Sequence, residues 1–81
     1  MFAQYAAKVV QALDSVKENE GRGHRRTIRW YIHDADLNLG FAARHAEHGD
    51  LPELYRLQQL RNQTVARFDF FQRLLIWLYL W

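Results

Sequence analysis

Residues 50–81, DLPELYRLQQLRNQTVARFDFFQRLLIWLYLW, predict a single long helix, and the rest of the expected fold is arranged around it. Asp50 can cap the start, Pro52 fits the first turn, and Glu53 completes an arrangement like a capping box. Mostly apolar side chains then recur every three or four residues, which is the spacing of one helical face. That face comprises Leu57, Leu60, Thr64, Phe68, Phe71, Leu75 and Leu78, and a second line runs through Tyr55, Ala66, Phe70, Trp77 and Trp81. Some thirty residues give a helix about 45 Å long.

The last eight residues of this segment, Leu74-Leu75-Ile76-Trp77-Leu78-Tyr79-Leu80-Trp81, have no polar side on a helix. A surface helix keeps a polar face toward water, so a helix that is apolar all round has to be covered. Eight residues span only about 12 Å, far less than the ~20 residues that cross a bilayer. We therefore expect another part of the chain, a second copy, a partner or a membrane surface to cover this end.

Two further helices are expected upstream. Residues 2–19 have the spacing of an ordinary amphipathic helix, and Gly21 is a plausible stop. Residues 24–48 carry a heptad seam with small residues at several positions, which favours close helix–helix contact. The seam consists of Ile28, Ile32, Ala35, Leu39, Ala42 and Ala46, and a second stripe of Trp30, Leu37 and Phe41 lies well round from it.

These patterns predict an all-α fold in one domain, residues 1–81. We expect a three-helix antiparallel (up-down-up) bundle with helices at about 2–19, 24–48 and 51–80. The chain has 81 residues, 49% of them hydrophobic, and twelve aromatic side chains. A core of this size is only marginally sufficient to bury so many large side chains. Completion of the bundle by oligomerisation is therefore expected.

Four arginines, Arg22, Arg25, Arg26 and Arg29, stand at the predicted start of the second helix. Exposed backbone N–H groups and guanidinium groups together make a good receptor for phosphate or carboxylate. A solvated basic turn is the plainer interpretation, because four arginines and a net charge of +2 are not diagnostic of nucleic-acid binding. In an up-down-up bundle this cluster would lie beside the apolar end of the third helix.

Several polar residues carry smaller predictions. Arg61 falls near the apolar seam of the third helix, so it is expected to pair with an acid or to extend from the seam's edge. Asp34, Asn38 and His45 form a polar line that reads as a partly solvated flank, with a buried network as the alternative.

Metal binding and catalysis are not expected. The pairs His33/Asp36 and His45/His48 stand three residues apart, but the third helix offers no matching ligands. The chain has no cysteine, and its only serine, Ser15, has no evident base. We therefore expect no metal site, no cofactor and no enzymatic activity. The first eight residues do not read as a secretory signal, and a cytoplasmic location is expected.

The sequence thus favours a small non-catalytic interaction protein that self-associates, most simply as a dimer. The expected interface lies on the apolar faces of the second and third helices and consists of Trp30, Leu37, Phe41, Phe70, Leu74, Trp77, Leu78 and Trp81. One alternative is a regulatory protein that binds nucleic acid, or an acidic protein, through Arg22, Arg25, Arg26 and Arg29. A second alternative is peripheral membrane association through the apolar carboxyl end.

Overall fold

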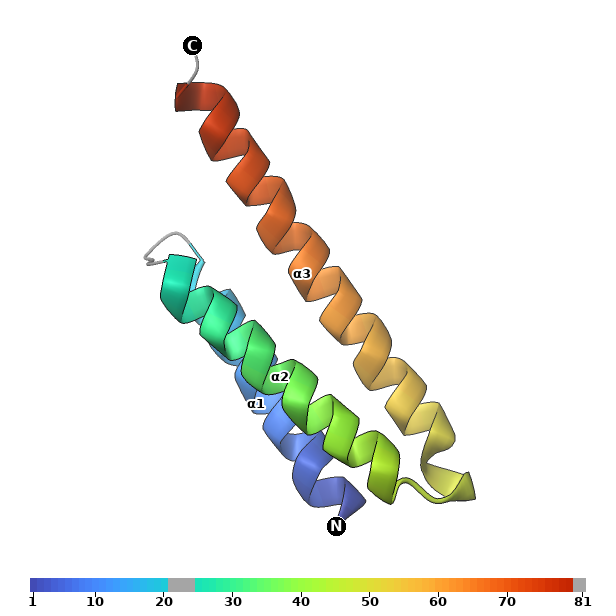
Figure 1. Cartoon of the computed structure of the whole chain (residues 1–81). Coiled ribbons are helices and arrows are strands. Elements are labelled where there is room, and N and C mark those ends of the chain that lie inside the picture. The colour runs from blue at the N-terminus through green and yellow to red at the C-terminus, as the bar shows by residue number, and fades with distance from the viewer. Residues whose placement is uncertain (21–24, 80–81) are drawn as a thin grey trace.

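The computed structural model describes residues 1–20 and 25–79, and Figure 1 shows them as long helices lying along one another. The helices are α1 (Phe2–Asn19), α2 (Arg25–His45) and α3 (Leu51–Tyr79), with a 3₁₀ turn at His48–Asp50 before α3. No strand occurs in these two ranges. The prediction of an all-α fold is confirmed.

The connection between α2 and α3 differs in detail from expectation. α2 ends at His45, three residues before the expected end at His48. The carboxylate of Asp50 accepts a hydrogen bond from the backbone N–H of Glu47 at 3.0 Å. Glu53 pairs with Arg56 at 2.9 Å. Asp50 therefore holds the turn that leads into α3. Residues 46–48, which the helical period assigned to the second helix, lie outside α2, and His48 begins the 3₁₀ turn. His24 and Leu80, at the outer limits of two expected helices, lie outside the described residues.

α1 and α2 run in opposite directions side by side and make the closest pairing in the molecule (Figure 1). Their contact is built on small residues, which let two helix backbones approach closely. The main cluster of buried residues comprises Ala6, Val9, Ala12 and Leu13 of α1, Ala35 of α2 and Leu57 of α3. Ile28, Ala35 and Ala42 of the predicted seam on the second helix are all buried. The alanine-rich seam is therefore the contact that the heptad spacing predicted.

α3 lies against this pair for only part of its length. A second cluster joins Val16 of α1, Ile28 of α2 and Phe68 of α3. At the same level Arg67 bonds the carboxylate of Glu20, just past the end of α1, at 3.2 Å. Beyond this level Figure 1 shows α3 continuing past the end of the α1–α2 pair.

An ion pair fixes α3 against α2 midway along the contact. Arg61 donates two hydrogen bonds to Asp36, Nε to Oδ1 at 2.7 Å and a terminal nitrogen to Oδ2 at 3.1 Å. The hydrogen bond to Asp36 raises the pKa of Arg61, while burial of the guanidinium acts in the opposite direction. The prediction that Arg61 pairs with an acid is confirmed.

Candidate interaction surface

The carboxyl-terminal part of α3, residues 70–79, is called the α3 extension here because it reaches past the α1–α2 pair. The same helical line that is buried lower on α3 continues into it. Leu57 is 1% exposed and Phe68 5% exposed, whereas Leu75 and Leu78 on that line are 46% and 59% exposed. The apolar line therefore continues along the sequence of α3, but its side chains are buried only as far as Phe68. Beyond that level α1 and α2 have ended and no longer cover it.

Apolar side chains also lie on the other faces of the α3 extension, together with Gln72 and Arg73. Phe70, Phe71, Leu74, Ile76 and Trp77 are exposed large side chains. With Leu75 and Leu78 they leave about 500–900 Å² accessible, taking half of the 150–250 Å² that a large side chain can bury. The largest apolar patch on an ordinary monomer is about 300–600 Å². The exposed apolar surface of the α3 extension is thus at or above the upper end of the range for an ordinary monomer.

A second apolar stripe lies on the outer side of α2. Trp30 is 60% exposed, and Leu37 and Phe41 are exposed as well. Leu37 follows buried Ala35 by two residues, which is about 200° around a helix. α2 thus carries three large exposed side chains on the side away from its buried seam. The ring of Phe41 lies near that of Tyr5 of α1, at a centroid distance of 5.4 Å.

The structure does not bring the two predicted stripes into one patch. Trp30, Leu37 and Phe41 point away from the seam of α2, while Phe70, Leu74, Trp77 and Leu78 belong to a segment beyond the end of the α1–α2 pair. A single chain therefore presents two separate apolar surfaces. Trp81, the remaining member of the predicted interface, lies outside the described residues.

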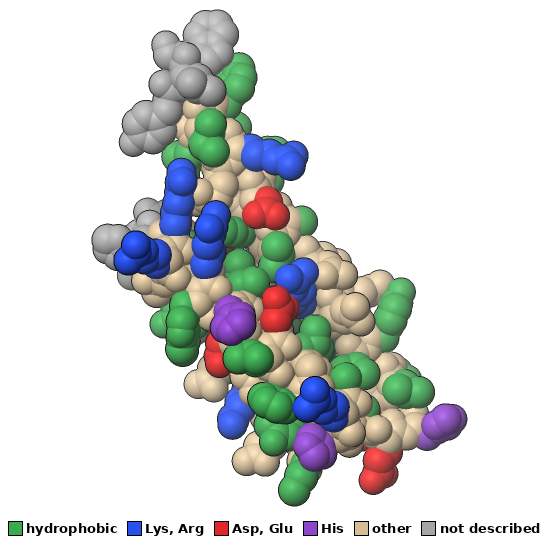
Figure 2. Space-filling model, viewed as in Figure 1, with side chains coloured by type: hydrophobic (Ala, Val, Ile, Leu, Met, Phe, Trp, Pro, Cys, Tyr) green, Lys and Arg blue, Asp and Glu red, His purple; other side chains and the backbone are tan. Residues whose placement is uncertain are grey.

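The outer face of α2 is also basic. Arg25, Arg26 and Arg29 are exposed, and none of them forms an ion pair with another described residue. The acids of α2, Asp34 and Asp36, are only partly exposed and turn toward neighbouring helices. Figure 2 shows basic side chains gathered over the start of α2, with apolar side chains at the end of α3 nearby. Arg22, the fourth arginine of the predicted cluster, lies outside the described residues.

The polar line Asp34–Asn38–His45 is a local feature of α2. Asn38 is buried and donates to the backbone carbonyl of Asp34 at 2.9 Å. His45 is exposed and stacks on Tyr5 at a ring-centroid distance of 5.3 Å. Within the described residues no three His, Asp or Glu side chains are grouped so that they could hold a metal ion.

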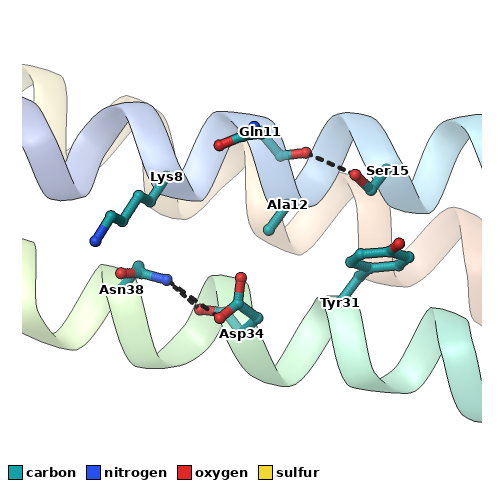
Figure 3. A pocket seen from close by; sticks show the side chains of 7 residues that line it. All are labelled: Lys8, Gln11, Ala12, Ser15, Tyr31, Asp34 and Asn38. Carbon is teal, nitrogen blue, oxygen red and sulfur yellow. Dashed lines mark hydrogen bonds between the residues drawn. The ribbon is translucent and has the colours of Figure 1, made fainter.

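A crevice of about 370 Å³ lies between α1 and α2 (Figure 3). Its lining residues are Lys8, Gln11, Ala12, Ser15, Tyr31, Asp34 and Asn38. The hydroxyl of Ser15 donates to the backbone carbonyl of Gln11 at 3.1 Å, and the lining contains no histidine that could act as its base.

Comparison with known proteins does not identify a relative: no protein-family model, curated protein or solved structure matches this chain. Among the described residues, no helix has both the length and the apolar character needed to span a membrane. The α3 extension is therefore the feature of this molecule that most needs a functional explanation.

Proposed function

We propose that this protein is a small, non-catalytic interaction module that self-associates, and that its three helices form an up-down-up bundle completed by a second copy. The observation that carries the proposal is the seam of α3, which is buried at Leu57 and Phe68 and open at Leu75 and Leu78. Apolar surface gains about 25 cal/mol per Å² when it leaves water, so an open seam favours association.

The size of the surface agrees with this proposal. A standard interface buries about 800 Å² per partner. The exposed side chains of the α3 extension offer a comparable area, about 500–900 Å². A dimer is favoured over larger assemblies because two-fold symmetry closes an interface and leaves no unsatisfied copy of it.

The test is the molar mass in solution, measured by light scattering across a concentration series. The wild-type chain, of 9.7 kDa, should show the mass of two chains. Leu74→Glu places a charge inside the proposed interface and should reduce the mass to one chain. Leu37→Glu, on the outer face of α2, is the matched control and should leave the dimer intact. A single-chain mass for the wild type at all concentrations would refute self-association.

The Leu37→Glu result also decides between the two apolar stripes. If this variant is monomeric and Leu74→Glu is not, the outer face of α2 is the interface in place of the α3 extension. Co-sedimentation of a monomeric wild-type chain with anionic lipid vesicles would instead assign the α3 extension to a membrane surface.

A second candidate function rests on the exposed arginines of α2. Arg25, Arg26 and Arg29 flank the exposed ring of Trp30, a combination suited to phosphate contacts and base stacking. Binding of a labelled oligonucleotide should then weaken as salt rises. Replacing Arg25 and Arg26 by alanine should reduce the affinity, whereas Arg56→Ala on α3 should not. Equal affinity of all three proteins would remove this candidate.

A further inference from the structure

A second apolar feature lies at the opposite end of the molecule from the α3 extension. A groove of about 300 Å³ runs between α1 and α3 and is lined by Phe2, Ala3, Ala6, Ala7, Val10 and Glu53. We call it the α1–α3 groove. Figure 1 shows that the amino end of α1 and the start of α3 lie together at this end. The one charged group in its lining, Glu53, is already paired with Arg56.

The groove and the α3 extension lie on the same side of α3. Glu53, Leu60, Arg67 and Leu74 follow one another at seven-residue steps, and such a line drifts by only about 20° per step around a straight helix. Leu60 packs against the core shared with α1, and Arg67 bonds Glu20 past the end of α1. This line therefore faces α1 along the covered part of α3, and Leu74 continues it into the extension.

We propose that the second copy packs antiparallel, so that the α3 extension of each chain lies in the α1–α3 groove of the other. This inference rests on the proposed self-association and specifies its geometry. A two-fold axis across the middle of the molecule exchanges its two ends, so both grooves and both extensions are covered at once. Such an interface is closed and self-complementary.

The two surfaces match in shape and length. The α3 extension presents large side chains, including Phe70 and Leu74, and the groove presents the small side chains Ala3 and Ala7. Large residues facing small ones is the arrangement that lets helices interdigitate. The extension is about 15 Å long, and the groove from Ala3 to Val10 spans about 10 Å of α1. The extension carries one charged residue, Arg73, which lies about 100° around the helix from Leu74. The groove lining contains no unpaired charge, and the basic outer face of α2 remains uncovered.

The test uses the absence of cysteine from the chain. Chains carrying Ala3→Cys and chains carrying Leu74→Cys are mixed, equilibrated and mildly oxidised, and disulfide-linked species are identified by non-reducing electrophoresis and mass spectrometry. Ala3 lies level with Glu53, and Leu74 is 21 residues further along α3, about 31 Å away on the same chain. Each of these chains has a single cysteine, so every disulfide joins two chains, and a link between positions 3 and 74 requires their Cα atoms to come within about 7 Å in the dimer.

The antiparallel arrangement predicts that Ala3→Cys and Leu74→Cys chains form the mixed covalent dimer. The matched control is a mixture of Leu37→Cys and Leu74→Cys chains, which should give about tenfold less product because position 37 faces away from the interface. Self-linking of Leu74→Cys chains above the mixed product would show that two extensions meet each other. That result would overturn the antiparallel arrangement and leave self-association standing.

A second test of the groove uses a substitution in place of disulfide cross-linking. Ala7→Phe fills the groove and should weaken dimerisation by about tenfold or more, and Ala43→Phe, at an exposed position of α2, should not. If Ala7→Phe dimerises as tightly as the wild type, the groove is not occupied by the partner. A wild-type chain that is monomeric by light scattering would refute the proposed self-association itself. Failure of the antiparallel arrangement and failure of self-association therefore give different results.

Discussion

The two halves of α3 have similar apolar periodicity and opposite surroundings. In the lower half Leu57, Thr64 and Phe68 are buried, and Arg61 is bonded to Asp36. In the α3 extension the same line continues through Leu75 and Leu78, which are exposed. Whether an apolar helical residue belongs to a core thus depends on the length of the helices beside it. α1 and α2 contain 18 and 21 residues, whereas α3 contains 29.

The largest expected effect comes from truncating matched leucines in the two halves. Leu57→Ala removes a fully buried side chain and should lower the free energy of unfolding by about 2–5 kcal/mol. Leu75→Ala should lower it by less than about 1 kcal/mol at a protein concentration where the chain is monomeric, because little contact is lost. Urea denaturation followed by circular dichroism measures both.

Raising the protein concentration sharpens this comparison. In a dimer, the loss caused by Leu75→Ala should grow with concentration, because unfolding is then coupled to dissociation. A loss from Leu75→Ala equal to that from Leu57→Ala in the monomer would contradict the difference between the halves.

A smaller effect is expected from the ion pair that fixes the lower half of α3. Asp36→Ala should lower the free energy of unfolding by about 1 kcal/mol, since the pair is partly exposed and partly screened by solvent. Arg56→Ala, which breaks the exposed pair with Glu53, is the control and should have almost no effect. A double-mutant cycle with Arg61→Ala isolates the pair energy. An Asp36–Arg61 coupling indistinguishable from zero would show that apolar packing alone positions α3.

The pKa of Arg61 sets the pH behaviour of this pair on its basic side. Its folded pKa is raised by the hydrogen bond to Asp36. A raised folded pKa means that this contribution is fully present below the unfolded pKa of arginine and is lost only as the pH rises through the folded value. Arg61 therefore stays protonated at neutral pH, where its coupling to Asp36 should not change with pH. The coupling should weaken only in strong alkali, where Arg61 loses its proton.

The smallest expected effect concerns α2, the helix that packs against the lower half of α3 and ends before the α3 extension. A Cβ added at Gly40 would have no neighbour within 4 Å. Gly40→Ala should therefore raise the free energy of unfolding by up to about 1 kcal/mol through helix propensity. Thermal unfolding monitors the gain, and light scattering should show an unchanged molar mass. A loss of stability, or a change of mass, would mean that this side of α2 is covered by a partner.

Much of the local structure is predictable from the sequence because it depends on residues close together in the chain. The helical periods and the alanine-rich seam of α2 are visible in the spacing of side chains. For Arg61 the sequence predicts an acid partner as one of two outcomes and does not identify Asp36, which lies 25 residues away in the chain. Details of the connection between α2 and α3 are less visible. The carboxylate of Asp50 could bond forward or backward, and the turn places it on the N–H of Glu47.

The sequence by itself determined that this chain is all helical, that α3 is the longest helix, and that its carboxyl end is apolar on every side. These properties follow from side-chain periodicity and length, which are local. Only the tertiary structure decided where α1 and α2 stop covering α3. It also decided that Trp30 and Leu37 lie on a different surface from Leu74, and that the α1–α3 groove opens at the end opposite the α3 extension. These depend on which segments pack side by side and at what level, and that is set by contacts such as Val16 and Ile28 with Phe68 between residues far apart in the chain.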